Sequence, residues 1–90
     1  MLVQVAIIIP DGQMLIGETM PNGKKERHPD LMWRALPFLD IESYDGTELQ
    51  GFIDENGKFF NRRNAVIEAI KCGQIVKPKW PPDLYSEDLW

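Results

Sequence analysis

Cysteine and histidine are scarce in this chain, which holds Cys72 and His28 as its single examples among 90 residues. One cysteine cannot form an intramolecular disulfide, a pattern typical of a reducing cytosol. Structural and catalytic metal sites need three or four well-placed ligands, and no Cys-x-x-Cys or His-x-x-x-His spacing is present. The sequence therefore excludes a disulfide scaffold and argues against a dedicated metal site.

Long apolar runs are also missing. The first ten residues, Met-Leu-Val-Gln-Val-Ala-Ile-Ile-Ile-Pro, are the most apolar stretch, but they are far too short to span a bilayer. They lack the basic start of a signal peptide, and their β-branched residues favour a buried strand. We expect a soluble, single-domain protein over residues 1–90 that makes no membrane contact.

The motifs of catalysis are absent. Neither Gly-x-x-x-x-Gly-Lys nor Gly-x-Gly-x-x-Gly occurs, and Ser43 and Ser86 have no nucleophile elbow around them. Cys72 falls at the end of a predicted helix, where the helix dipole disfavours a thiolate, so we interpret it as a small packing residue. These absences predict a binding protein without a cofactor rather than an enzyme.

The net charge of −4 is unevenly distributed. Residues 40–55 carry only acids, whereas residues 58–79 carry six bases and one acid, Glu68. A net-acidic protein is a poor general DNA binder, but a local basic surface can hold a small anion. Two other interpretations stay open: a solvated charged surface, and an acidic surface at 40–55 that inhibits a protein partner such as a nuclease or repressor.

Periodicity and turn chemistry predict an α+β fold. Asn56-Gly57 is a strong hairpin signal, Pro29 suits the first turn of a helix, and Gly73 suits a left-handed helix end. We expect a small antiparallel sheet of two hairpins, with two helices on one side and a docked C-terminal tail. The expected strands are 2–9, 14–17, 49–53 and 58–60, and the expected helices are 29–36 and 62–72, the second with Val66, Ile67, Ala69 and Ile70 on its buried face.

Three groups of residues suit recognition of a phosphate-bearing ligand. Arg27 and His28 precede one helix start, and Arg62 follows Asn61, the expected cap of the other. Phe52 on the neighbouring hairpin could offer a face for a base. The alternatives are that the phenylalanines of this hairpin lie in the core and that His28 caps its own helix.

Several blocks of the sequence resemble a group of small bacteriophage proteins that includes the anti-Thoeris sponges (Thoeris anti-defence, first family). The resemblance covers about two-thirds of the chain, chiefly from residue 27 onward. It is carried by Arg27-His28-x-Asp30, by Gln50-Gly51-Phe52-Ile53 with Gly57-x-Phe59 and Arg62, by Ala65, Ala69 and Gly73-Gln74-Ile75, and by Leu84-Tyr85-Ser86-Glu87-Asp88-Leu89-Trp90.

The resemblance implies a protein that sequesters a cyclic ADP-ribose-type or cyclic oligonucleotide immune signal without cleaving it. It also implies a homodimer or a higher homo-oligomer of dimers, acting in the cytoplasm of the infected host. The positions that it assigns to ligand binding are Phe52 as base platform, Arg62 as phosphate contact, Arg27 and His28 near the ligand, and the tail from Ser86 through Glu87 and Asp88 to Trp90 as a lid or subunit contact.

Overall fold

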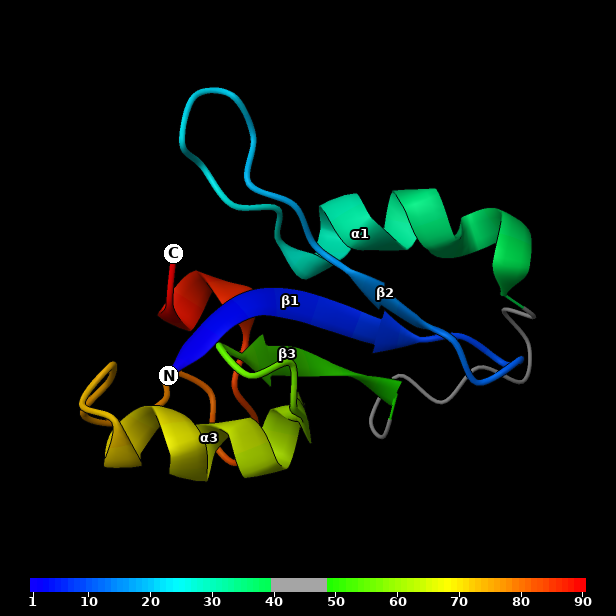
Figure 1. Ribbon diagram of the computed structural model, residues 1–90. Coiled ribbons are helices and arrows are strands. Elements are labelled where there is room, and N and C mark those ends of the chain that lie inside the picture. Colours follow the sequence, from blue (N-terminus) through cyan, green and yellow to red (C-terminus); the bar gives the residue numbers. More distant parts are fainter. Residues whose placement is uncertain (40–48) are drawn as a thin grey trace.

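The computed structural model describes residues 1–39 and 49–90. A four-stranded antiparallel sheet runs in the order β2-β1-β3-β4, so two hairpins meet through β1 and β3. The helix α1 lies beside β1 and β2, and α3 lies beside β3 and β4 (Figure 1). The α+β prediction is confirmed. The strands are β1 (Leu2–Ile8), β2 (Met14–Ile16), β3 (Gln50–Asp54) and β4 (Phe59–Asn61), and the helices are α1 (His28–Ala35) and α3 (Arg62–Lys71), with short 3₁₀ turns at Leu36–Phe38 and Ser86–Asp88.

The predicted hairpin turn at Asn56-Gly57 is present and is organised by Asp54. Its Oδ1 accepts hydrogen bonds from the backbone N–H groups of Asn56 and Lys58, each at 2.9 Å. The bond from Lys58 is the largest cause that lowers the pKa of the Asp54 carboxyl. Gly57 takes a φ of +81°, a left-handed conformation that glycine adopts at little cost. Asp54 and Gly57 together explain why the chain reverses here.

One apolar core joins the sheet, both helices and the tail. Val5, Ile7 and Phe52 supply its sheet side, Leu31 its α1 side, and Leu84 its tail side, and all five are fully buried. Both helices therefore pack against the same face of the sheet, and the tail docks as predicted.

The inward face of α3 differs from the prediction. Ala65 and Ala69 are fully buried, whereas Ile67 is 67% exposed and Ile70 45% exposed. Two alanines four residues apart let the helix backbone come close to the sheet, which turns the larger isoleucines outward. The predicted buried face was wrong for Ile67 and Ile70.

The C-terminal half is tied to β1 by a side chain. Gln74 Nε2 donates to the Leu2 carbonyl at 2.9 Å, and the Leu2 N–H donates to Gln74 Oε1 at 2.7 Å. Gly73 before it has a φ of +75°, so the predicted left-handed helix end is confirmed. Most of the acidic stretch that the protein-inhibitor interpretation requires, residues 40–48, lies outside the described residues.

Candidate nucleotide-binding groove

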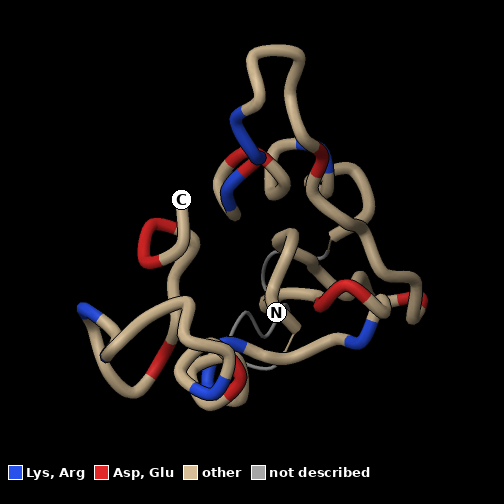
Figure 2. The backbone as a smooth tube through the Cα atoms, turned by 60° about the vertical axis from the view of Figure 1, so that its left-hand side comes forward, with Lys and Arg blue, Asp and Glu red and all other residues tan. Residues whose placement is uncertain are grey.

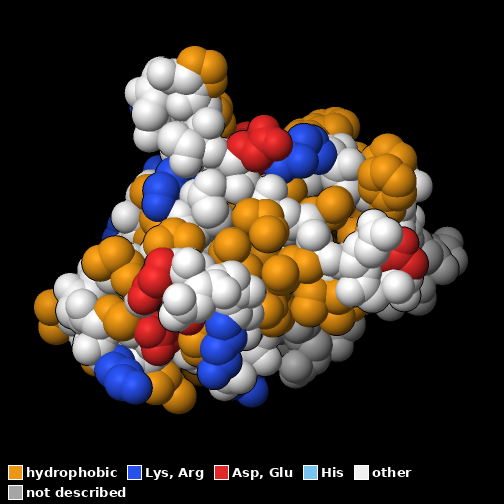
Figure 3. Space-filling view, in the orientation of Figure 1, with side chains coloured by type: hydrophobic (Ala, Val, Ile, Leu, Met, Phe, Trp, Pro, Cys, Tyr) orange, Lys and Arg blue, Asp and Glu red, His pale blue; other side chains and the backbone are white. Residues whose placement is uncertain are grey.

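A groove of about 680 Å³ lies between the loop that precedes α1 and the C-terminal turn. Figure 2 shows basic residues at the base of that loop and acidic residues on the turn opposite. In the space-filling view the loop projects from the body, with cationic side chains at its root (Figure 3). We call this the basic–aromatic groove. Its lining residues are Met20, Gly23, Lys24, Lys25, Arg27, Asp30, Leu89 and Trp90.

The loop is held in an ordered arm by its own backbone. Thr19 and Lys25 form an isolated antiparallel bridge, and the Glu26 N–H donates to the Glu18 carbonyl at 2.8 Å. Near the tip, the Met20 N–H donates to the Lys24 carbonyl at 2.7 Å. This arm brings a run of cationic residues from the loop to the wall of the groove.

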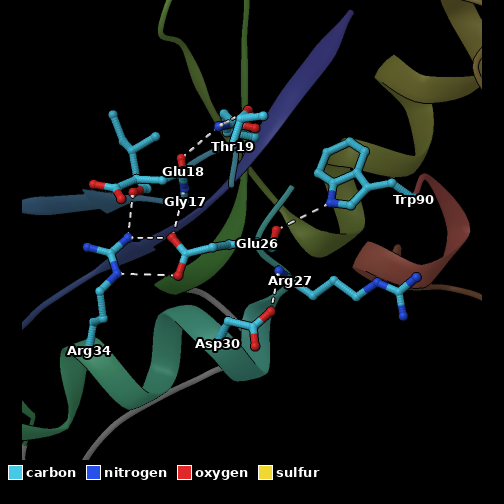
Figure 4. A network of polar contacts seen from close by, with 10 residues as sticks. Gly17, Glu18, Thr19, Glu26, Arg27, Asp30, Arg34 and Trp90 are labelled. Carbon is cyan, nitrogen blue, oxygen red and sulfur yellow. Dashed lines mark hydrogen bonds and ion pairs between the residues drawn. The ribbon is translucent and has the colours of Figure 1, made fainter. Parts of the chain in front are cut away.

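Glu26 and Arg34 fix the root of the arm to α1. Arg34 Nη2 donates to Glu26 Oε1 at 2.7 Å and to the Ile16 carbonyl at 3.1 Å (Figure 4). The hydrogen bond from Arg34 is the main cause that lowers the pKa of Glu26. Glu26 Oε1 also accepts the Glu18 N–H at 2.8 Å. One carboxylate thus joins the two strands of the arm to the helix.

Arg27 has its backbone and its side chain in different roles. Its N–H donates to Asp30 Oδ2 at 3.0 Å, which caps the start of α1. Its side chain extends along the groove below Trp90 (Figure 4). The prediction that Arg27 stands at a helix start is confirmed, and the structure places its side chain on a groove wall.

Trp90 forms the aromatic side of the groove. Its indole Nε1 donates to the Glu26 carbonyl at 3.3 Å, and its ring meets Phe52 edge-on with centroids 6.2 Å apart. The Lys25 ammonium lies 4.9 Å from the ring centroid, within reach of a cation–π interaction. Trp90 is half-buried, so the tail is docked while one side of it reaches the groove.

Phe52 and His28 lie behind the groove, in the protein interior. Phe52 is fully buried, so the prediction that its ring serves as a base platform was wrong for this chain. The reason is register, because Phe52 pairs with Val5 across β1 and β3 and shares its inward face. His28 is 2% exposed, and it meets Phe52 edge-on at 4.9 Å. Neither side chain lines the groove.

His28 is a neutral structural residue. Its Nε2 lies 2.7 Å from the Gly51 carbonyl oxygen, which only accepts, so Nε2 carries the ring proton. Burial, assisted by the positive charge of Arg62, lowers the pKa of His28 to about 4. The alternative that His28 caps or hydrogen-bonds its own helix was wrong, because its ring bonds to β3 and Arg27 is the cap residue of α1.

Asn61 and Arg62 lie at the start of α3 and do not line the groove. Asn61 Oδ1 accepts the Asn64 N–H at 2.8 Å, so the predicted helix cap is confirmed. The central carbon of the Arg62 guanidinium lies 4.9 Å from the centroid of the Tyr85 ring. The backbone carbonyl of Arg62 accepts the Leu84 N–H at 2.9 Å. Arg62 therefore holds the tail, and the structure does not bring it together with Arg27 on one groove wall.

The predicted tail residues divide by role. Ser86 is buried, and its Oγ accepts the His28 N–H at 3.4 Å. Asp88 accepts the Tyr85 and Lys79 N–H groups at 2.9 and 3.0 Å, so its carboxylate shapes the tail. Glu87 is exposed. Of the tail residues predicted for ligand binding, only Trp90 lines the groove.

Comparison with known proteins decides the family. The family described as phage T4 y16D protein matches residues 3–90, almost the whole chain. This chain belongs to the phage T4 y16D protein family. No curated protein and no solved structure matches it.

For this y16D-family protein, sequence reasoning missed the two lysines of the groove. Lys24 and Lys25 lie in a segment that reads only as a polar loop with Pro21 and Gly23. The signal that was available is the run Lys24-Lys25-Glu26-Arg27, in which three of four residues are cationic. What it could not show is that the chain's last residue, Trp90, closes over the same place.

Other reactive groups of this y16D-family protein lie away from the groove. Cys72 is exposed, with its Sγ 3.0 Å from Glu68 Oε1, so the interpretation as a packing residue was wrong. Across residues 1–39 and 49–90, no group of three or more His, Cys, Asp and Glu side chains is arranged to hold a metal ion. No helix in the same ranges is long and apolar enough to cross a bilayer.

Proposed function

We propose that this phage protein binds a compact, phosphate-bearing nucleotide in the basic–aromatic groove and holds it without cleaving it. The observation that carries the proposal is that Lys24, Lys25, Arg27 and Trp90 line one groove, which has a volume of about 680 Å³. That volume falls within the usual range for small-molecule sites, about 300–1,000 Å³. Cations suit phosphate oxygens, and an indole suits a stacked base.

The chemistry of the lining supports retention rather than turnover. A hydrolytic site needs a nucleophile or a water-activating base oriented by a further group. The residues that line the groove include no serine, threonine, cysteine or histidine. Its one acid, Asp30, already accepts the Arg27 N–H. Such a site provides electrostatic and stacking contacts and little means to break a phosphate or glycosidic bond.

The resemblance to anti-Thoeris sponges narrows the proposed ligand to a cyclic ADP-ribose-type or cyclic oligonucleotide signal. Sequestration of such a signal would prevent a host defence effector from being activated. Membership of a phage family fits a role during infection. We further propose that the protein acts as a homodimer or as an oligomer of dimers, as the resemblance implies.

Calorimetric titration with cyclic ADP-ribose isomers and with cyclic di- and trinucleotides tests the proposal. We expect saturable binding by one of these compounds, and recovery of the unchanged compound after heat denaturation, identified by mass spectrometry. Absence of heat with every compound contradicts the proposed ligand class. Recovery of a converted product would instead identify an enzyme.

A further inference from the structure

Lys25 stands out from the other cations of the groove because its ammonium is already engaged by the protein. Its Nζ donates to the Val3 carbonyl at 2.5 Å and lies 4.9 Å from the Trp90 ring centroid. Within residues 1–39 and 49–90, the hydrogen bonds of Lys24 beside it run through its backbone, to Asn22 and Met20. The two adjacent lysines therefore differ in how their side chains are placed: Lys25 is held against the protein, whereas Lys24 is exposed on the groove wall.

The Val3 carbonyl is the acceptor for Lys25. The pairing of β1 with β3 shifts register between Leu2 and Gln4, so the ladder is irregular at Val3. On the other side of β1, the pairing with β2 ends at Ala6 and Ile16, so Val3 lies beyond the end of that hairpin. The Lys25 ammonium donates to this carbonyl, and one charged group thereby joins β1, the arm before α1 and the C-terminal tail.

The indole is held from three sides. The Glu26 carbonyl accepts its N–H at 3.3 Å, Phe52 meets it edge-on with centroids 6.2 Å apart, and Lys25 holds a positive charge near its ring. Phe52 is fully buried, and the contact to Glu26 is a single hydrogen bond. Lys25 adds a third contact, a charge that lies over the indole ring from the arm.

We propose that Lys25 is a positioning residue that fixes the Trp90 ring as a preformed wall of the groove, and that Lys24 and Arg27 are left to meet the phosphates. The second half of this inference rests on the proposed function, whereas the first concerns the free protein. A preformed wall lowers the ordering cost of ligand binding, because the ring does not have to be immobilised when the ligand arrives.

The test uses Trp90 fluorescence in the ligand-free protein. Trp33→Phe with Trp80→Phe removes the other two tryptophans, both of which are exposed, and leaves Trp90 as the single emitter. In that background, Lys25→Met keeps the length of the side chain and removes its charge. We expect red-shifted emission, stronger acrylamide quenching and lower anisotropy. Lys25→Arg, which keeps a cationic donor, should restore the parent signal.

Lys24→Met is the matched control, since it removes a neighbouring charge from the same wall. It should leave the Trp90 emission at the parent value. Equal emission from the Lys24→Met and Lys25→Met proteins would overturn the positioning role. If circular dichroism shows that Lys25→Met does not fold, Lys25→Gln replaces it in the comparison, since glutamine is a shorter, uncharged hydrogen-bond donor.

Binding separates this inference from the proposed function. In Lys25→Met the Trp90 ring has to be ordered when the ligand arrives, which should weaken the binding of cyclic ADP-ribose or a cyclic dinucleotide by about 2- to 10-fold. If the parent protein binds neither compound, the proposed function fails, while the fluorescence comparison still decides the role of Lys25. If binding is normal in Lys25→Met and its emission is unchanged, the positioning role alone fails.

Discussion

His28 donates its Nε2–H to the Gly51 carbonyl at 2.7 Å, and this hydrogen bond joins the first residue of α1 to the middle of the sheet. The ring is 2% exposed, and Phe52 covers it edge-on. Protonation would place a charge in this apolar setting, next to the positive charge of Arg62. The fold therefore depends on a neutral His28, and stability should depend on pH for that reason.

The folded-state pKa of His28 is lowered from 6.5 to about 4, so the unfolded chain binds this proton first. The stabilisation by neutral His28 is fully present above pH 6.5 and is lost as the pH falls toward 4. The two pKa values correspond to about 3 kcal/mol. Urea unfolding over this range should show the loss in the wild type and not in His28→Gln, which keeps a donor that does not titrate. Parallel pH profiles of the two proteins would contradict this account.

Phe52→Ala should destabilise the protein by about 3–5 kcal/mol, because it empties the centre of the core. A small domain has about 5–15 kcal/mol in total, so the variant should lose a large share of its stability and unfold at a lower denaturant concentration. Trp33→Ala is the control, since Trp33 is 76% exposed, and it should change stability by about 0.5 kcal/mol or less. A fully stable Phe52→Ala protein that fails to bind nucleotide would instead restore Phe52 as a ligand contact.

Gly51 lies where the sheet leaves no room for a side chain. A Cβ at this position would overlap the Phe60 carbonyl oxygen on β4, far closer than two non-bonded atoms can approach. Gly51→Ala should therefore push β3 away from β4 and lower the free energy of unfolding by about 1–3 kcal/mol or more. The position-matched control is Gly57→Asn, where nothing lies within 4 Å and asparagine tolerates the positive φ. Its cost should be about 1 kcal/mol or less. Chemical denaturation of both variants measures the difference.

The ion pair of Arg34 with Glu26 should contribute about 1 kcal/mol, since it is partly exposed. Arg34→Met removes it together with the bond to the Ile16 carbonyl. Lys24→Met, which removes an exposed cation of the same arm, is the control. The pKa of Glu26 is lowered, so this contribution is present above its usual value of 4.5 and is lost as the pH falls through the folded-state value. Thermal unfolding should also show that added salt weakens the wild type more than Arg34→Met. No such difference in salt dependence would mean that the pair contributes little.

Local signals were sufficient for most of the fold. Asn56-Gly57 predicted the β3–β4 turn, and Asn61 and Gly73 predicted the two ends of α3, because each of these residues acts through its own backbone geometry. Phe52 was misplaced because alternation fixes which residues share a face, not which face is inward. That choice depends on packing against Leu31 and Leu84, far away in sequence.

The groove could not be predicted from local sequence signals, because it also depends on contacts between residues far apart in the sequence. The resemblance assigned both Arg27 and Trp90 to ligand binding, Arg27 near the ligand and Trp90 as part of a lid or subunit contact. Their direct meeting depends on the arm at Lys25 and on its bond to Val3, which neither hydrophobic pattern nor turn chemistry reveals. A cationic loop and an aromatic chain end were each visible, whereas their contact is a property of the tertiary structure.

Arg27→Ala should lower nucleotide affinity about 10- to 100-fold if the guanidinium meets a phosphate, because hydrogen bonds to charged groups contribute about 1.5–3 kcal/mol. Its binding should also vary less with salt than that of the wild type, since one screened contact is gone. Arg27→Lys, which keeps the charge and loses the planar fork, should be intermediate. Calorimetry at low and high salt gives both quantities.

Arg63→Ala is the control for charge alone. Arg63 is an exposed cation on α3, outside the groove, and lies 3.8 Å from Asp83. Its removal changes the net charge as Arg27→Ala does, so a general electrostatic effect would weaken binding equally in both variants. Equal losses would mean that the ligand responds to the overall field of the protein. A loss confined to Arg27→Ala would place the phosphate in the basic–aromatic groove, because only there does the guanidinium lie beside Trp90.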